Sequence, residues 1–338
     1  MNAVTGIERP PLGYRLLHTV QKEPDWSTIT DEELITYRDA ANRKAAARLS
    51  RVITGFPDRR ATIRWQEVTL ADRTVQVRVY RPTAEHATAL PLVLHVHGGG
   101  FVGTAPQCDW ANSHFAARLP AIVVSVEHRL LAPGSPLSAA VDDGWDVLRH
   151  LAENAADWGI DAARIAVAGE STGALIAALT AIRAKAADLP LRAQVLTNPV
   201  ADVTDSMFDY PSMVEHANSP GLTVARLRLF RELAVPEGTD PHAVSPLHAT
   251  DLSGLAPALV VVPTIDPVAD HGRRYAQRLG EFGTPARRSE HRGAPHAFLA
   301  LPGVVPQAKA ARAEITEFLD GHLAESQSTA RPTKATAR

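Results

Sequence analysis

The sequence predicts a doubly wound α/β fold built on a mostly parallel sheet. Five short apolar runs carry this prediction, because such runs are typical of strands buried on both faces of a parallel sheet: LVLHV, AIVVSV, RIAVA, AQVLT and ALVVVP. Stretches with helical character separate or follow these runs, at Ser138–Trp158, Thr172–Ala187, Ala269–Phe282 and Gln307–Leu323. Folds with this alternation bind their ligands at the carboxyl ends of the strands.

The region before the parallel strands is predicted to hold one helix and one hairpin. Thr30 and Glu33 have the spacing of a capping box, in which each residue satisfies a backbone N–H of the other, so a helix is expected from there to about Arg51. Segments Ile63–Leu70 and Thr74–Tyr80 alternate in polarity across a short polar turn, which indicates an antiparallel hairpin.

Two segments interrupt the alternation and are interpreted as a helical cap over the sheet. One is the N-terminal region, and the other runs from Asp202 to about Asp240 without a clear strand. The last fourteen residues are polar and basic, as expected of a disordered tail. The predicted organisation is an N-terminal cap segment, a first core part, a cap insertion, a second core part and the tail, at residues 1–55, 56–200, 201–240, 241–324 and 325–338.

Composition argues against several classes of protein. The 338 residues carry a formal net charge of −2, so the basic face of a nucleic-acid binder is not expected. Cys108 is the only cysteine, which excludes an intrachain disulfide and favours a reducing compartment. The first residues lack the apolar centre of a signal peptide, and no apolar window is long enough to span a membrane. A soluble cytoplasmic protein is therefore expected, with no nucleic-acid or membrane partner.

A candidate nucleophile lies between an apolar strand and an alanine-rich helix. Residues 169–173 read GESTG, the G-x-S-x-G pattern in which Ser171 sits on a sharp turn with small neighbours. The helix that follows points its N-terminal N–H groups toward developing negative charge. The alternative is a serine that only caps the helix between two glycines.

A candidate oxyanion loop follows the first parallel strand. A serine attacking a carbonyl creates a tetrahedral oxyanion, which needs preorganised donors. His97-Gly98-Gly99-Gly100 supplies bare backbone there, and the N–H of Thr172, after the nucleophile, is the usual second source of a donor. A flexible loop or a phosphate-binding turn is the alternative, although the following FVGTAPQ lacks the residues of a phosphate loop.

The histidines of this loop are interpreted as structural. His95 and His97 share one strand face, but no nearby cysteine or carboxylate completes a set of three metal ligands, so no metal is expected. His97 is instead expected to hydrogen-bond the loop backbone and fix its shape.

As an ordered set, the motifs resemble those of the hormone-sensitive-lipase-like family of α/β-hydrolases. The resemblance covers roughly residues 70–320 and rests on HVHGGGF, GESTG, Ser245–Leu247, Ile265–Gly272 and Gly293–Phe298, with further similarity in HRLLAPGSPLSAAVDD and AENAADWGIDAARIAVAGES. It implies an α/β-hydrolase fold with an eight-stranded, mostly parallel sheet and a helical cap, and esterase chemistry on small acyl esters.

By matched position, the resemblance also implies the site. Ser171 corresponds to the nucleophile, Asp266 to the orienting acid and His296 to the general base. Gly99, Gly100 and Thr172 correspond to the oxyanion N–H donors, with His97 and Gly98 supporting the loop. No cofactor is implied, and pairing through sheet edges in the family makes a homodimer an open alternative to a monomer.

This chain departs from the family pattern in two motifs. The elbow usually reads GDSAG followed by glycine, whereas here it reads GESTGA. The usual YRLAPE appears as HRLLAPG, with His128 for tyrosine, Gly134 for glutamate and one additional residue before the paired alanines. These departures concern local packing and substrate fit rather than the type of reaction.

Among fourteen histidines, two are placed to act as the base. His291 closes the apparent late strand ARRSEH and is expected at the rim. His296 lies beyond it in a Gly-Ala-Pro loop and is favoured. Asp266 follows an apolar strand and is favoured as the acid over Asp270, which is expected to complement a helix dipole. The alternative for Asp266 is an Asp-Pro turn former.

The predicted activity is hydrolysis of short-to-medium acyl esters through an acyl-enzyme, with a small-molecule ester as the only partner. An amidase, a lactonase or an acyltransferase could use the same residues, and a non-catalytic receptor of this fold would usually lack one of them. The predicted lid contributes either an apolar substrate pocket or only its own packing face, through Trp26, Phe208, Tyr210, Met213, Leu227 and Phe230.

Overall fold

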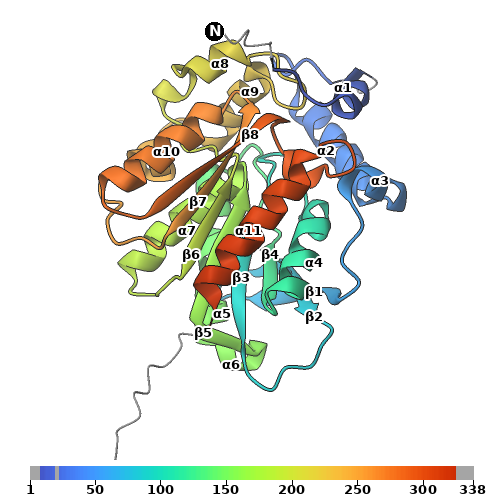
Figure 1. Ribbon diagram of the computed structural model, residues 1–338. Coiled ribbons are helices and arrows are strands. Elements are labelled where there is room, and N and C mark those ends of the chain that lie inside the picture. Colours follow the sequence, from blue (N-terminus) through green and yellow to red (C-terminus); the bar gives the residue numbers. More distant parts are fainter. Residues whose placement is uncertain (1–7, 20–22, 325–338) are drawn as a thin grey trace, which may run out of the picture.

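An eight-stranded sheet forms the centre of the computed structural model, which describes residues 8–19 and 23–324 (Figure 1). The strand order is β1-β2-β4-β3-β5-β6-β7-β8. The pairs β1–β2 and β2–β4 are antiparallel and all others are parallel. The strands are β1 Ala61–Thr69, β2 Thr74–Pro82, β3 Leu90–Val96, β4 Ile122–Val126, β5 Ile160–Glu170, β6 Ala193–Thr197, β7 Ala258–Ile265 and β8 Ala286–Pro295.

Helices connect the strands and cover the sheet. The α-helices are α1 Leu12–Thr19, α2 Asp31–Ala46, α3 Arg51–Thr54, α4 Asp109–Arg118, α5 Leu137–Glu153, α6 Ala155–Trp158, α7 Thr172–Ala186, α8 Pro211–Glu215, α9 Val224–Ala234, α10 Ala269–Glu281 and α11 Gln307–Leu323. Short 3₁₀ helices are η1 Arg48–Ser50, η2 Ala105–Cys108, η3 Asp205–Phe208, η4 His242–Val244, η5 Pro246–His248 and η6 Phe298–Ala300.

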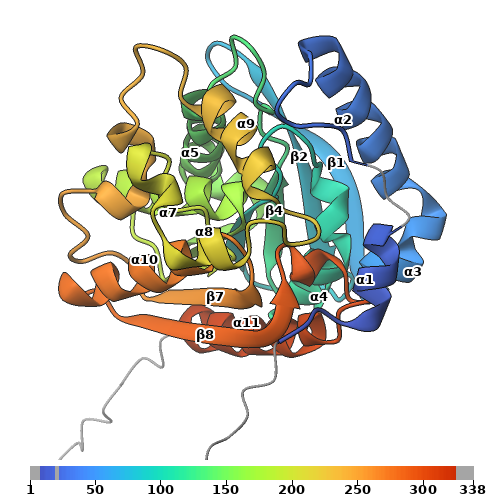
Figure 2. The ribbon, with the colours of Figure 1, turned by 90° about the horizontal axis from the view of Figure 1, so that it is seen from above.

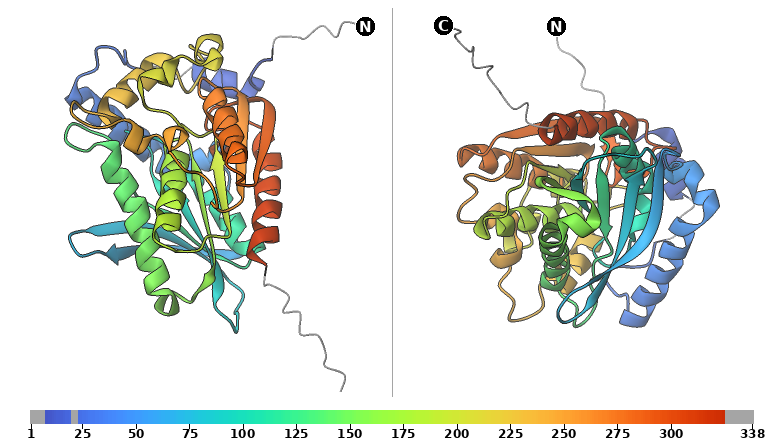
Figure 3. Two further views of the ribbon diagram at one scale, coloured as in Figure 1. Left: turned by 90° about the vertical axis from the view of Figure 1, so that its left-hand side faces the viewer. Right: turned by 90° about the horizontal axis from the view of Figure 1, so that it is seen from below.

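The two faces of the sheet are both buried, as continuous apolar strands require. On one face, α4 and α11 share an apolar cluster with Val93 and Val123. On the other face, α5, α7 and α10 share one with Leu92, Leu94 and Val124. Figure 3 shows these helical layers on either side of the strands. The predicted α/β-hydrolase fold with an eight-stranded, mostly parallel sheet is confirmed.

Most predicted elements appear, with three differences at their ends. The capping box of Thr30 and Glu33 starts α2, but the helix ends at Ala46 and η1 and α3 continue the segment. The predicted helix 138–158 breaks at Asn154 into α5 and α6. Strand β8 runs past His291 to Pro295, because it pairs with β7 again beyond a register shift.

Helices from two distant parts of the sequence lie over the carboxyl ends of the parallel strands (Figure 2). They are α1 and α2 from the N-terminal region, and α8 and α9 from the segment between β6 and β7. The Tyr14 hydroxyl of α1 donates a hydrogen bond to the Pro220 carbonyl, which ties the two groups together. We propose that these helices form the cap predicted for residues 1–55 and 201–240.

No helix within residues 8–19 and 23–324 has both the length and the apolar character needed to cross a membrane. The predicted tail, residues 325–338, lies outside the described residues.

Candidate active site

Ser171 occupies a sharp turn between β5 and α7. Its backbone has φ 54° and ψ −119°, a conformation that side-chain-bearing residues rarely adopt and that strains the chain. The flanking glycines permit the turn. A Cβ on Gly169 would lie 2.2 Å from the Gly173 carbonyl oxygen, and a Cβ on Gly173 would lie 2.2 Å from that of Val96. Ser171 is thereby held at the tip of a strand-to-helix turn.

Three side chains from different loops form a continuous hydrogen-bonded chain. His296, directly after β8, has Nε2 2.8 Å from Ser171 Oγ and Nδ1 2.7 Å from Asp266 Oδ2. Asp266 follows β7, is fully buried, and its other oxygen accepts a hydrogen bond from the Val268 N–H at 3.0 Å. Because an ionised carboxylate only accepts, Nδ1 carries the imidazole proton and Nε2 is left to accept the serine proton.

The two alternative residues point elsewhere. His291 Nε2 lies 3.4 Å from Glu314 Oε2, on the side of α11. Asp270 accepts a hydrogen bond from the Ser212 N–H at 2.9 Å and pairs with Arg273. Neither side chain contacts Ser171, His296 or Asp266. Asp270 lies in the first turn of α10, as expected.

The glycine loop packs directly against the turn that holds Ser171. A Cβ on Gly98 would lie 3.5 Å from Ser171 Cβ. Gly99 has φ +96°, and a Cβ there would lie 1.7 Å from the Val102 carbonyl oxygen; one on Gly100 would lie 2.5 Å from the Phe230 ring. Among the described residues, nothing accepts a hydrogen bond from the Gly99 or Gly100 N–H. These two donors are free for a ligand.

Three polar side chains hold the loop in shape: His97 and His128, which are buried, and Gln107, which is half-buried. The Gly98 carbonyl accepts from Gln107 Nε2 at 2.9 Å and lies 3.0 Å from His97 Nδ1. The imidazole rings of His97 and His128 stack with their centroids 4.3 Å apart. Burial lowers the pKa of both histidines, which favours the neutral form of each ring. Sequence reasoning missed Gln107, although Thr104 and Gln107 have capping-box spacing and form one.

A family model for the alpha/beta hydrolase fold matches residues 93–300, a range that contains the whole hydrogen-bonded chain. This chain belongs to the α/β-hydrolase family. The resemblance to its hormone-sensitive-lipase-like members is confirmed by this match together with relatives that are named esterase and carboxylesterase.

Several of these relatives are named for ester hydrolysis. Esterase LipI of Mycobacterium tuberculosis is 36% identical over 242 residues, which cover 69% of this chain and 74% of the relative. An ethyl acetate hydrolase of Pseudomonas putida is 32% identical over 279 residues, covering 81% and 87%. The solved structure of an ester hydrolase from the Lake Arreo metagenome superposes with a TM-score of 0.82 at 30% identity, covering 93% of this chain and 99% of that one.

A pocket of about 280 Å³ opens onto Ser171 and His296 of this α/β-hydrolase. The glycine loop forms one wall, and the predicted cap forms another through Tyr37, Leu227 and Phe230. Of the six apolar lid residues considered from the sequence, only Leu227 and Phe230 line this pocket. Trp26 and Phe208 line a separate cavity, and Tyr210 and Met213 pack within the fold. Both expectations for the lid therefore apply, to different residues.

The departure HRLLAPG changes packing rather than the reacting groups. His128 supplies the ring that stacks on His97, and Arg129 binds the buried carboxylate of Asp143 at 2.9 Å. Gly134 has φ +80° at the tip of the loop, where a Cβ would have no other described atom within 4 Å.

The two histidines of the glycine strand have different surroundings. His97 faces His128 and the loop backbone, whereas His95 lies beside Cys108 and Glu170. The sequence argument against a metal site weighed only ligands close to His95 and His97 along the chain. It therefore missed a cysteine and a carboxylate that the fold brings to His95 alone.

Proposed function

We propose that this protein is a serine carboxylesterase in which Ser171, His296 and Asp266 hydrolyse esters with short-to-medium acyl chains. The chain is a carboxylic ester hydrolase, as its family and its esterase relatives indicate. The observation that carries the assignment of residues is the continuous chain from Asp266 through His296 to Ser171, with separations of 2.7 and 2.8 Å.

In the first step, Ser171 Oγ attacks the ester carbonyl carbon while His296 Nε2 takes the hydroxyl proton. Asp266 stabilises the resulting imidazolium through Nδ1–H. The tetrahedral intermediate then collapses, the alcohol leaves with the proton from Nε2, and an acyl-Ser171 ester remains. Water repeats the sequence with His296 as base, which releases the carboxylic acid and restores the serine.

The N–H groups of Gly99, Gly100 and Thr172 are the proposed donors to the oxyanion. The free amides at Gly99 and Gly100 support this role, as does the position of Thr172 at the first turn of α7. Preorganised donors of this kind contribute about 3–4 kcal/mol each to the transition state. Their geometry is set by glycine backbone, so the loop needs no rearrangement when charge develops.

The size of the pocket supports small substrates. Its volume of about 280 Å³ lies just below the range of about 300–1,000 Å³ for small-molecule sites. Apolar walls from Leu227 and Phe230 suit an acyl chain or an alcohol group of limited length. The cytoplasmic location predicted from the single cysteine belongs to the same proposal, and fractionation of cells expressing tagged protein tests it.

Substitution of the nucleophile tests the assignment. Ser171→Ala should abolish hydrolysis of p-nitrophenyl butyrate and labelling by a fluorophosphonate probe, with an unchanged circular dichroism spectrum. Wild-type protein should hydrolyse p-nitrophenyl esters with acyl chains from acetyl through hexanoyl faster than it hydrolyses the lauroyl ester. Turnover by a folded Ser171→Ala variant would reject the triad, and a preference for amide or lactone substrates would reject the esterase assignment.

A further inference from the structure

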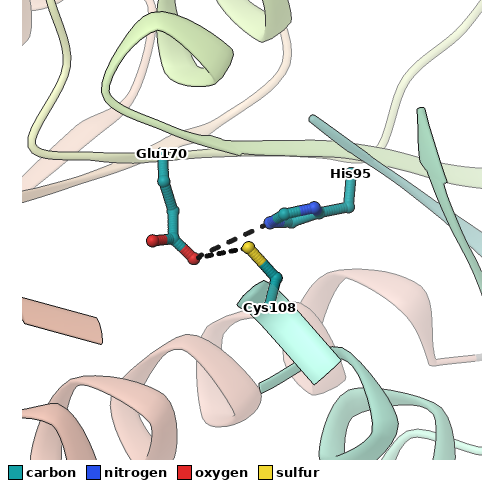
Figure 4. Close-up of side chains that lie close together, drawn as sticks. All are labelled: His95, Cys108 and Glu170. Carbon is teal, nitrogen blue, oxygen red and sulfur yellow. Dashed lines mark hydrogen bonds and ion pairs between the residues drawn. The ribbon is translucent and has the colours of Figure 1, made fainter. Parts of the chain in front are cut away.

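Three buried side chains with metal-binding atoms meet beside the turn that holds Ser171 (Figure 4). Cys108 Sγ lies 3.6 Å from Glu170 Oε1, and His95 Nε2 lies 3.8 Å from the same oxygen. One atom from each residue falls within 4.8 Å of the other two, and all three residues are at least nine-tenths buried. The proposed ester hydrolysis uses none of these side chains.

The sheet explains why residues so distant in sequence converge. His95 is near the carboxyl end of β3 and Glu170 is the last residue of β5, and alternation points both toward the face covered by α4 and α11. Cys108 ends η2, which leads directly into α4 on that face. The cluster is thus fixed by two strands and a helix start rather than by a mobile loop.

We propose that His95, Cys108 and Glu170 bind a single zinc-class divalent cation, and that binding inhibits the esterase. A tetrahedral Zn²⁺ with ordinary bond lengths separates a sulfur and an oxygen ligand by about 3.6 Å, and a nitrogen and an oxygen ligand by about 3.4 Å. The observed separations are 3.6 and 3.8 Å. The third pair, Cys108 Sγ and His95 Nε2, lies within 4.8 Å, against about 3.6 Å around a tetrahedral Zn²⁺, so these side chains must close by up to about 1 Å. A water supplies the fourth ligand.

His95 Nε2 lies 3.8 Å from Glu170 Oε1, longer than a hydrogen bond, and the side chain is only 3% exposed. Its other nitrogen, Nδ1, lies 3.0 Å from Ser125 Oγ. A proton on Nδ1, donated to this hydroxyl, leaves the Nε2 lone pair facing Cys108 and Glu170. Histidine ligands of metals are usually oriented by such a hydrogen bond to the second nitrogen.

The charges of the cluster match a divalent cation. Without metal, the Cys108 thiol donates a hydrogen bond to Glu170 Oε1 at 3.6 Å and so carries its proton. The cation displaces that proton to solvent, and the thiolate and the Glu170 carboxylate neutralise its two charges. A mixed nitrogen, sulfur and oxygen set favours Zn²⁺ or Cd²⁺ over Mg²⁺ or Ca²⁺. Glu170 and Gln107 line the pocket that contains Ser171, which supplies the entry route.

Glu170 and Cys108 each adjoin a part of the proposed catalytic apparatus, and this links binding to inhibition. Glu170 precedes Ser171, and its carbonyl oxygen would lie 3.0 Å from a Cβ on Gly98. The residue before Cys108 is Gln107, which donates to the Gly98 carbonyl. When the cation draws Glu170 and Cys108 together, it shifts both the turn that holds Ser171 and the glycine loop. The inhibition therefore rests on the proposed function, whereas the binding does not.

Cadmium titration of the full chain tests the binding. The thiolate-to-cadmium absorption band in the ultraviolet should appear and saturate at one Cd²⁺ per chain. It should be absent in Cys108→Ser. Loss of a single orienting partner of a metal ligand already weakens binding by about 10–100-fold, so His95→Gln, which removes a ligand, should weaken it by at least about 100-fold. His291→Gln is the matched control and should bind as wild type, because that histidine faces Glu314 instead.

Inhibition is measured on the same samples with p-nitrophenyl butyrate. Activity of wild type and His291→Gln should fall in proportion to the cadmium band, and Cys108→Ser should retain its activity. The absence of a band in folded wild type, or an equal band in His95→Gln, would overturn the site. A band without loss of activity would overturn the inhibitory role. Failure of metal-free wild type to hydrolyse any ester would instead reject the proposed function, and the band would be unaffected.

Discussion

Substitution of Gly99 by alanine separates the chemical role of the glycine loop from its structural cost. Gly99 has φ +96°, and an added Cβ would lie 1.7 Å from the Val102 carbonyl oxygen, a contact that backbone atoms must relieve by moving. The unfavourable φ alone costs about 1–3 kcal/mol of stability. Displacing an oxyanion donor should lower kcat by about 10²–10³-fold.

Gly134→Ala is the matched control for this substitution. Gly134 also has a positive φ, +80°, but no described atom lies within 4 Å of the added Cβ and the residue does not line the pocket at Ser171. It should lose a similar amount, about 1–3 kcal/mol, to backbone strain and keep the kcat of wild type.

The assay combines kcat for p-nitrophenyl butyrate with the free energy of unfolding from urea titration. Gly99→Ala should lose more stability than Gly134→Ala, because of the clash with Val102, and only Gly99→Ala should lose activity. A folded Gly99→Ala variant whose kcat stays within about threefold of wild type would refute the oxyanion role of this loop.

Three other substitutions test the site and the fold. Asp266→Asn should lower kcat by about 10³–10⁴-fold while the protein stays folded, because the amide no longer fixes the imidazole tautomer; an unchanged kcat would contradict the triad. Phe230→Ala should shift the acyl preference toward longer chains, since this ring narrows the pocket at Ser171, whereas Phe208→Ala, in the separate cavity, should not. Burial lowers the pKa of His97 and His128, so the unfolded chain binds protons that the folded chain does not, and the free energy of unfolding should fall as pH drops below about 6.5. His128→Tyr should reduce this slope by up to about 1.4 kcal/mol per pH unit, measured by urea unfolding at several pH values, and an unchanged slope would show that His128 is protonated when folded.

Periodicity and local signals predicted the elements well where one physical requirement dominated. The helix expected at Gln307–Leu323 is found at those residues, and the Thr30–Glu33 capping box starts α2 as expected. The predicted helix 138–158 instead breaks at Asn154. No proline or glycine marks that break, where the Asn154 side-chain amide donates a hydrogen bond to the His150 carbonyl at 2.8 Å.

The residues proposed to react were predictable because their chemistry restricts the sequence around them. A strained turn at Ser171 needs glycine at 169 and 173, and an oxyanion loop needs consecutive glycines, so both leave local patterns. The choice of His296 over His291 rested on the Gly-Ala-Pro context of His296 and agreed with the family resemblance. In the structure, the direction of each ring gives the same choice, because only His296 reaches Ser171.

The supporting contacts had no comparable local pattern. Gln107 reaches Gly98, nine residues away in the sequence, and Cys108 reaches Glu170 across 62 residues. A glutamine or a cysteine in a loop is compatible with many environments, and which environment it meets depends on how the strands pair. For this reason the sequence did not predict that His95, Cys108 and Glu170 lie together.

The sequence by itself determined the alternation of strands and helices, the glycine positions and the identity of the groups proposed to react, because backbone geometry and periodic burial constrain neighbouring residues directly. Tertiary structure alone decided which side chains meet across β3, β5 and α4, how large the pocket is, and which cap residues face Ser171. These properties depend on distances between segments far apart in the chain, and strand order and helix packing set those distances.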